Sequence, residues 1–184
     1  MVLTKSLGKL KTGDNAPNFN LKGIDGKTYG LTNFKAAKAL LIVFMCNHCP
    51  YVKAKTEAIK NLQAKYKGKG LVVVGINSND AADYPEDSFD GMVKTAKEKS
   101  FNFIYLIDET QEIAKAYGAS CTPDPFLFDA EKKLAYHGRL NNQMEPSDTP
   151  TEHDMDEAIN AVLAGKKPKH DFLYSIGCSI KWKK

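Results

Sequence analysis

The hydrophobic positions divide this chain into alternating strand-like and helix-like segments. Two runs of large apolar residues, 39–45 (ALLIVFM) and 71–77 (LVVVGIN), have the length and continuous hydrophobicity that are typical of buried strands. Between them, apolar residues recur at helical spacing from about Pro50 to Tyr66, and Gly68 follows where such a helix should stop. A strand, a helix and a second strand in this order predict a βαβ unit, and therefore parallel strands within a sheet.

Shorter elements lie on either side of this unit. Phe19 and Leu21 alternate with polar residues, as do Tyr29 and Leu31, and the Asp-Gly pair at 25–26 is typical of a turn, so we expect an N-terminal β-hairpin. The other expected elements are, in chain order, a helix with its apolar face at 89–96, a strand at 103–107, a short helix ended by Gly118, strands at 125–128 and 133–137, and a last helix that opens with the capping-box residues Thr151 and Asp154 and ends at Gly165.

The composition is that of a soluble globular protein. Of the 184 residues, 42% are hydrophobic and 26% are charged, so we expect a single domain across residues 1–184. No stretch approaches the roughly 18 consecutive apolar residues of a membrane span, and residues 1–17 lack the apolar segment of a signal peptide. Four cysteines are too few for a disulfide scaffold. We therefore expect a cytoplasmic protein with no membrane partner.

Positive charge is concentrated at the C-terminal end. The whole chain has a net charge of +4, whereas the basic C-terminal tail, residues 166–184, has six lysines and one acidic residue, Asp171. Nucleic-acid recognition usually depends on arginine and on clustered charge, but Arg139 is the only arginine and aromatic and basic residues do not alternate elsewhere. We therefore expect no nucleic-acid partner.

The candidate chemistry lies where the first long strand meets the helix. Cys46 and Cys49 form a Cys-x-x-Cys pair, and Pro50 suits the first turn of a helix, so we expect Cys46 at or just before the helix N-terminus. The helix dipole favours a thiolate there. We predict that Cys46 attacks a disulfide and that Cys49 resolves the product. A cationic His48 between them would stabilise the Cys46 thiolate and make the disulfide more oxidising.

A Cys-x-x-Cys pair also occurs in zinc sites, where Cys46, His48 and Cys49 would serve as ligands without catalysis. Such sites normally add a second Cys-x-x-Cys or two histidines separated by three to five residues. Neither is present, and Cys121 and Cys178 are single and distant in the sequence. We therefore favour a redox dithiol and expect no bound metal and no cofactor.

Three stretches together resemble a known family. They are GDNAPNFNL with DGKTYGLTNF near the N-terminus, CNHC after the first long strand, and TPDPFLFD after a short helix. This pattern resembles the AhpC/TSA (peroxiredoxin-like) branch of the thioredoxin superfamily over residues 13–165. The resemblance implies a thioredoxin-like α/β fold, with a central mixed β-sheet flanked by helices. It also implies a cis-proline opposite the cysteines, Pro123 after Thr122, which exposes a backbone edge to an extended substrate. Pro125 is the competing candidate for the cis bond.

The sequence departs from better-known members of this superfamily. Thioredoxins have Trp before the first cysteine and Gly-Pro between the two, whereas Met45 and Asn47-His48 stand here, and the histidine is more like the oxidising members. The peroxiredoxin motif Pro-x-x-x-[Ser/Thr]-x-x-Cys fits neither cysteine, and Leu40 stands where thioredoxin has a buried carboxylate. The CNHCPY and terminal GCSIKW stretches are most similar to an uncharacterised group often labelled thiol-disulfide isomerase or thioredoxin.

Five further residues are candidates for supporting roles. Cys121, near the expected cis-proline, is either a third redox sulfur or a buried structural cysteine. Cys178 is too far along the chain to place, and it is either a C-terminal resolving cysteine, as in some peroxiredoxins, or structural. Asn79 and Asp80 follow a parallel strand, at the edge where sites collect in such sheets. Arg139 is either an anion or thiolate partner or a member of a surface ion pair.

These observations favour a thiol-disulfide oxidoreductase. Its partners would be a protein or small-molecule disulfide and a thiol that reduces or oxidises the dithiol. Two alternatives stay open. A thiol-dependent peroxidase would oxidise Cys46 to a sulfenic acid that Cys49 then resolves. A non-catalytic protein would use the same residues for metal binding or for an interaction.

Overall fold

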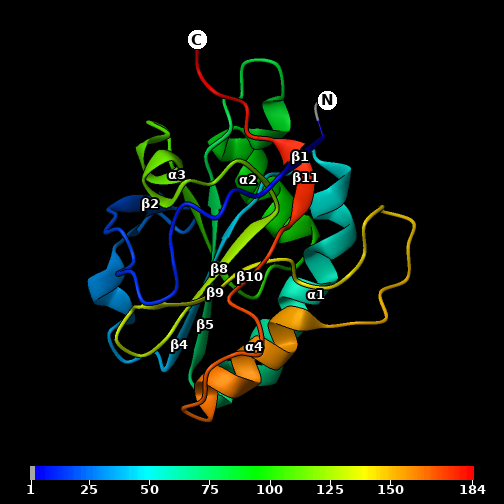
Figure 1. Cartoon of the computed structure of the whole chain (residues 1–184). Coiled ribbons are helices and arrows are strands. Elements are labelled where there is room, and N and C mark those ends of the chain that lie inside the picture. Colours follow the sequence, from blue (N-terminus) through cyan, green and yellow to red (C-terminus); the bar gives the residue numbers. More distant parts are fainter. Residues whose placement is uncertain (1–2) are drawn as a thin grey trace.

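The computed structural model describes residues 3–184 of the chain. At its centre is an eight-stranded mixed sheet in the order β10-β9-β8-β4-β5-β6-β2-β3, flanked by helices (Figure 1). The strands of this sheet are β2 (Leu21–Gly23), β3 (Thr28–Tyr29), β4 (Ala39–Phe44), β5 (Leu71–Asn77), β6 (Ile104–Ile107), β8 (Asp124–Phe128), β9 (Leu134–Gly138) and β10 (Phe172–Leu173). The helices are α1 (Pro50–Tyr66), α2 (Phe89–Glu98), α3 (Glu112–Tyr117) and α4 (Asp154–Leu163).

Both faces of the central strand β4 are buried. Leu41 and Val43 belong to an apolar layer that α1, α2 and α4 cover, whereas Leu40 and Ile42 belong to a second layer with α3 and the N-terminal segment. Successive side chains of a strand point to opposite faces, so a strand that is covered on both sides needs an uninterrupted hydrophobic run. Both layers share one sheet, which supports the proposal of a single domain.

The predicted βαβ unit is confirmed. β4 pairs parallel with β5, and β5 pairs parallel with β6, whereas β8 pairs antiparallel with β4. The bounds of α1 and β5 agree with the prediction. The carboxyl ends of parallel strands meet at one edge of a sheet, and at this edge β4 leads into the cysteine motif.

Two local predictions differ from the structure. β2 and β3 form the expected hairpin, but Phe19 lies outside it and Leu31 already begins a 3₁₀ turn. The predicted capping box of Thr151 and Asp154 is wrong, because α4 begins at Asp154 itself and no side chain caps its N-terminus. Thr151 lies outside the helix, and its hydroxyl accepts a hydrogen bond from the side chain of Asn142 instead.

The basic C-terminal tail is part of the fold. β10 extends the main sheet beside β9. β11 (Ile176–Ser179) lies between β1 (Leu3–Lys5) and β7 (Cys121–Thr122) in a separate three-stranded sheet. Figure 1 shows β1 and β11 side by side near the start of α1. The tail therefore returns to the region of the cysteine motif.

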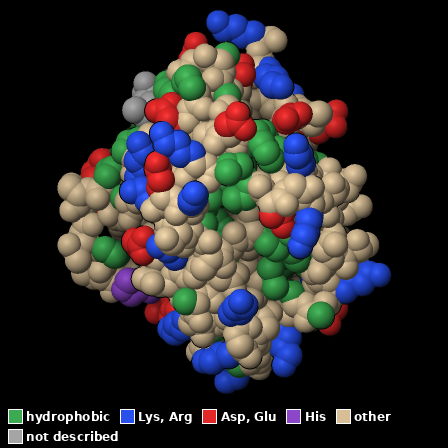
Figure 2. Space-filling view, turned by 180° about the vertical axis from the view of Figure 1, so that it is seen from behind, with side chains coloured by type: hydrophobic (Ala, Val, Ile, Leu, Met, Phe, Trp, Pro, Cys, Tyr) green, Lys and Arg blue, Asp and Glu red, His purple; other side chains and the backbone are tan. Residues whose placement is uncertain are grey.

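Charged side chains of both signs are interspersed over most of the face shown in Figure 2, and hydrophobic side chains gather near its centre. Within residues 3–184, none of the helices has the length and apolar character that crossing a membrane requires.

Candidate active site

The cysteine motif occupies the connection between β4 and α1. β4 ends at Phe44, and α1 begins at Pro50 with Cys49 as its N-cap residue. Cys46 therefore lies three residues before the N-cap, which is farther from the helix than the expected position at or just before its N-terminus. Cys46 and Cys49 are 1% and 0% exposed, and no disulfide joins them. The helix N-terminus consequently acts most strongly on Cys49.

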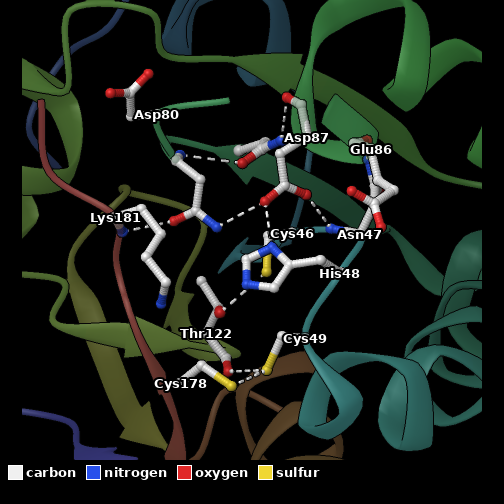
Figure 3. Close-up of polar contacts among 12 residues, drawn as sticks. Cys46, Asn47, His48, Cys49, Asp80, Glu86, Asp87, Thr122, Cys178 and Lys181 are labelled. Carbon is white, nitrogen blue, oxygen red and sulfur yellow. Dashed lines mark hydrogen bonds and ion pairs between the residues drawn. The ribbon is translucent and has the colours of Figure 1, made fainter. Parts of the chain in front are cut away.

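Thr122 contacts both cysteines of the motif (Figure 3). Its hydroxyl oxygen lies 3.2 Å from Cys46 Sγ, and its carbonyl oxygen lies 3.4 Å from Cys49 Sγ. The Thr122–Pro123 bond is cis, as predicted, whereas Pro125 lies within β8. Thr122 is thus linked to both sulfur atoms by polar contacts.

A buried histidine–carboxylate contact lies beside the first cysteine (Figure 3). His48 Nδ1 and Asp87 Oδ2 are 2.5 Å apart, and the imidazole stacks on Tyr84 with 3.9 Å between the ring centroids. Asp87 also accepts hydrogen bonds from the backbone N–H of Asn47 at 2.6 Å and from the amide of Asn79 at 2.9 Å. Burial alone would raise the pKa of Asp87, but these hydrogen bonds hold it below its usual value. The site therefore contains a buried carboxylate.

The sequence indicates only part of this network. Asn79 contacts Asp87, but the Asp80 carboxylate accepts a hydrogen bond from the backbone of Ala82 and does not bind the motif. Asp87 is not predicted from the sequence, because it is one of several acidic residues in the polar segment 78–88. Only the folding of that segment over the motif distinguishes Asp87 from its neighbours.

Cys49, and not Cys46 as predicted, is the more acidic thiol of the motif. A hydrogen bond from Cys46 lowers the pKa of Cys49 to about 5 against the effect of burial, and Cys178 and the backbone N–H of Val52 add to this. Burial raises the pKa of Cys46 well above its usual value, and the neighbouring Cys49 and Asp87 raise it further. In the reduced protein the negative charge is therefore favoured on Cys49, and the predicted Cys46 thiolate is not supported.

Two physical effects account for this difference. Val52 is the third helical residue, so its N–H points at the N-cap position, and there the helix N-terminus favours negative charge on Cys49. The Asp87 carboxylate binds His48 Nδ1 and disfavours a second negative charge on Cys46. His48 therefore does not make Cys46 the more acidic thiol.

The other two cysteines lie on paired strands. Cys178 in β11 is opposite Thr122 in β7, and its sulfur atom lies 2.7 Å from that of Cys49. Cys121, on β7, directs its thiol to the carbonyl of Pro123 at 3.7 Å. The structure thus brings Cys178 to the motif and turns the Cys121 thiol toward a backbone carbonyl.

The backbone edge beside the cis-proline is covered. β7 pairs with β11, and both residues of β7, Cys121 and Thr122, are buried. A Cβ atom on Gly177 of β11 would lie 2.0 Å from the carbonyl oxygen of Thr122. The predicted open edge for an extended substrate is therefore wrong, because the chain's own C-terminal strand occupies it.

Arg139 forms ion pairs with Glu152 at 2.8 Å and with Asp154 at 2.7 Å. Its guanidinium is thus engaged by two carboxylates near the start of α4, which agrees with the ion-pair interpretation and not with a thiolate contact.

One cluster within the described residues 3–184 could hold a metal ion. Cys46, His48 and Asp87 each offer one ligand atom within 4.8 Å of the others, and all three residues are buried. This set replaces Cys49 of the predicted ligand set with Asp87. Sulfur, nitrogen and oxygen ligands of this kind suit zinc.

A cavity of about 450 Å³ lies beside the motif, along α1 and α2. Cys46 and Asn47 are among its lining residues, together with polar side chains such as Thr56 and Lys99, whereas Cys49 is not among them. A cavity of this size admits a small molecule, and the sulfur-bearing residue that it reaches is Cys46.

Sequence comparisons identify relatives with thiol chemistry. The Redoxin family model matches residues 11–159. The chain is 30% identical over 144 residues to a chloroplastic peroxiredoxin Q from Triticum aestivum, over 76% of this chain and 63% of that protein. It is 29% identical over 126 residues to the thiol-disulfide oxidoreductase ResA from Bacillus thuringiensis, over 68% of each. The match thus spans less than two thirds of the length of that peroxiredoxin.

Solved structures confirm the predicted fold class. The crystal structure of an uncharacterized conserved protein from Geobacillus kaustophilus has a TM-score of 0.94 at 42% identity, over 100% of this chain and 97% of that one. An exposed lipoprotein thioredoxin from Streptococcus pneumoniae has a TM-score of 0.60 at 25% identity, over 81% of this chain and 99% of that one. The fold of this chain is therefore thioredoxin-like.

Proposed function

The chain belongs to the Redoxin family of the thioredoxin superfamily, and from this premise we propose that it is a thiol-disulfide oxidoreductase with Cys46 and Cys49 as its redox dithiol. The predicted AhpC/TSA branch is confirmed, and the peroxiredoxin and disulfide-oxidoreductase relatives support a redox thiol function and an oxidoreductase. The reaction, the order of attack and the substrate class belong to the proposal.

The observation that carries the proposal is the hydrogen bonding of the two sulfur atoms. Thr122 contacts Cys46 Sγ through its hydroxyl at 3.2 Å and Cys49 Sγ through its carbonyl at 3.4 Å, and the neighbouring Cys46 thiol lowers the pKa of Cys49. The pair therefore holds one thiol and one thiolate at a helix N-terminus. Thiol-disulfide exchange needs this combination, because one sulfur attacks and the second resolves the mixed disulfide.

Access favours Cys46 as the attacking sulfur. Cys46 lines the cavity of about 450 Å³, whereas Cys49 lies on the side of β11 with its sulfur against Cys178. A substrate disulfide would therefore meet Cys46 first, although the negative charge rests on Cys49 before the reaction.

The proposed cycle begins when the Cys46 proton moves to the Cys49 thiolate. Cys46 Sγ attacks one sulfur of the substrate, the substrate S–S bond breaks, one thiolate leaves, and a mixed disulfide remains on Cys46. Cys49, at the helix N-terminus, then releases its proton to solvent and attacks Cys46 Sγ, and the second thiolate leaves. The substrate is reduced to two thiols while the protein acquires a Cys46–Cys49 disulfide. The reverse sequence would oxidise a dithiol.

His48 supports proton transfer in this scheme. Its ring lies beside the Cys46 sulfur (Figure 3), Asp87 binds Nδ1, and Nε2 is buried without a hydrogen-bond partner. Asp87 thus orients the ring, and Nε2 can exchange a proton with the leaving thiolate.

A small-molecule disulfide is the substrate class that we favour. β11 covers the backbone edge of Thr122, where an extended protein segment would pair. The cavity beside Cys46 is instead of a size that suits a small ligand. We propose a reducing or oxidising thiol as the second partner. We also propose a cytoplasmic location, and imaging of the tagged full chain in its native cells would test it.

The test is a turnover assay with bis(2-hydroxyethyl) disulfide and with insulin, using dithiothreitol as reductant. We expect catalysed reduction of the small disulfide and a much smaller effect on insulin. Cys46→Ser and Cys49→Ser should each abolish turnover, whereas Cys121→Ser, the matched control, should retain it. Wild-type turnover by Cys46→Ser would refute the proposal.

Peroxide reduction is the second candidate, and the Thr122 hydroxyl 3.2 Å from Cys46 Sγ favours it. A hydroxyl at that distance could hold a peroxide, although it comes from β7 and not from the motif of peroxiredoxins. Stopped-flow oxidation by hydrogen peroxide separates the two activities. Under the leading proposal the rate is that of an ordinary thiol, and a rate thousands of times faster would make peroxidase the main activity.

A further inference from the structure

Cys178 lies against the dithiol although 129 residues separate it from Cys49 in the chain. The two sulfur atoms are 2.7 Å apart, and both residues are buried. Strand pairing holds Cys178 in place, because β11 sets it opposite Thr122 of β7 on one side and Leu3 of β1 on the other. The third sulfur is therefore positioned by a sheet.

Cys49 is the middle sulfur of three (Figure 3). Its sulfur atom lies 2.7 Å from that of Cys178, and the neighbouring Cys46 thiol lowers its pKa. Cys121 is next to Thr122 in the sequence, but its thiol faces a backbone carbonyl. The fold thus selects Cys178, and not the cysteine beside the cis-proline, as the neighbour of Cys49.

We propose that Cys178 is a third redox residue, which takes over the disulfide from Cys46 and so restores the Cys46 thiol. The inference rests on the proposed function, because a Cys46–Cys49 disulfide must form first. Cys178 loses its proton to solvent and attacks Cys49 Sγ, the Cys46–Cys49 bond breaks, and Cys46 leaves as a thiolate that takes up a proton. One disulfide is exchanged for another, so this step needs no further oxidant.

The charges around Cys178 favour this step only after the first disulfide exists. In the reduced protein, burial and the adjacent Cys49 raise the pKa of Cys178 to about 12, although Lys181 acts in the opposite direction. A Cys49 that is bonded to Cys46 has no negative charge, so its contribution disappears while that of Lys181 remains. Oxidation of the dithiol thereby activates Cys178 as a nucleophile.

After the exchange, the disulfide and the thiol that reacts with substrate are on different cysteines. The disulfide moves to Cys49 and to Cys178 of β11, and Cys46, which is among the residues that line the cavity, is a thiol again. The oxidised protein therefore retains a substrate-facing thiol.

Peptide mapping of the full chain tests the inference. Reduced protein is treated with one equivalent of bis(2-hydroxyethyl) disulfide, quenched in acid, alkylated and digested with trypsin. Cys46 and Cys49 share the peptide 39–53, whereas Cys178 lies in 170–181 and Cys121 in 116–132. A Cys46–Cys49 bond thus stays within one peptide, and a Cys49–Cys178 bond links two.

We expect the main oxidised species to be 39–53 linked to 170–181 through Cys49, with Cys46 alkylated. Cys121→Ser should give the same link. Cys178→Ser and Cys178→Ala should lose it completely and accumulate the internal Cys46–Cys49 disulfide. In Cys46→Ser the link should form at least tenfold more slowly.

Two results would overturn the inference and leave the proposed function standing. The first is an oxidised wild type that contains only the internal Cys46–Cys49 disulfide. The second is a Cys49–Cys178 link that forms as fast in Cys46→Ser as in the wild type. If bis(2-hydroxyethyl) disulfide is not reduced and none of the three cysteines becomes oxidised, the proposed function fails and this inference fails with it.

Discussion

The hydroxyl oxygen of Thr122 lies 3.2 Å from the sulfur of Cys46, across 76 residues of chain. Burial raises the pKa of Cys46, and the Thr122 hydroxyl is the contact that acts in the opposite direction. It therefore stabilises the Cys46 thiolate at the moment of attack.

Replacing Thr122 by valine should slow the reaction of Cys46 with a small disulfide by roughly 10- to 100-fold. A hydrogen bond to a charged group contributes about 1.5–3 kcal/mol, and about 1.4 kcal/mol corresponds to tenfold. Thr122→Ser keeps the hydroxyl and should stay within about threefold of the wild type. The second-order rate constant with bis(2-hydroxyethyl) disulfide measures both, and equal rates for Thr122→Val and the wild type would contradict this role.

The ultraviolet thiolate absorbance of the reduced protein should rise with a midpoint at about pH 5, the pKa of Cys49. Cys49→Ser should lose this transition. Cys46→Ala, which removes the thiol that lowers the pKa of Cys49, should shift it upward. A first transition near the ordinary cysteine value of ~8.5 in the wild type would refute the assignment.

The same pKa shift makes stability depend on pH. Cys49 is deprotonated in the folded chain above about pH 5, but protonated in the unfolded chain up to ~8.5. The unfolded state binds more protons between these values, so the contribution of Cys49 to the free energy of unfolding is fully present above ~8.5 and is lost as the pH falls to about 5. Urea titrations of the reduced wild type and Cys49→Ser should therefore converge toward pH 5 and diverge toward pH 8.

Asp87→Asn should destabilise the protein and make Cys46 more reactive. Asp87 accepts hydrogen bonds from Asn47, Asn79 and His48 while buried, so a misplaced amide costs about 1–3 kcal/mol. The lost negative charge no longer raises the pKa of Cys46. Urea unfolding and the alkylation rate of Cys46 check the two effects. Asp83→Asn, at an exposed position, is the control, and unchanged stability in Asp87→Asn would contradict the prediction.

Gly177→Ala should displace β11. The added Cβ would lie 2.0 Å from the carbonyl oxygen of Thr122, and such overpacking costs about 1–3 kcal/mol. The melting temperature should fall by about 2–4 °C for each kcal/mol. Gly68→Ala, where a Cβ meets no atom within 4 Å, should change it little. An equal effect of both substitutions would show that β11 does not pack on Thr122 in this way.

Hydrophobic periodicity predicts the parts of this fold that are local. The run 39–45 and the helical face of α1 place the cysteine motif at a strand–helix junction, and the family resemblance supplies the cis bond before Pro123. Because Pro50 suits the first helical position, the residue before it, Cys49, is expected at the N-cap. The sequence alone therefore favours a thiolate on Cys49 over one on Cys46.

The remaining features depend on contacts between distant segments. Asp87 acquires its role because the segment before α2 folds over His48, and Cys178 because the C-terminal strand returns to β7. Neither residue lies in a periodic pattern that marks it. The pairing of β11 with β7 is also the reason why the expected open edge at Thr122 is closed.

The central claim, that Cys46 attacks a disulfide and Cys49 resolves it, is tested most directly by the mass of Cys49→Ser after treatment with bis(2-hydroxyethyl) disulfide. The mechanism predicts one mercaptoethanol group on Cys46, within the tryptic peptide 39–53, that dithiothreitol removes, and no label on that peptide in Cys46→Ser over the same time. An unmodified Cys46 in Cys49→Ser, together with rapid labelling of Cys49 in Cys46→Ser, would contradict it.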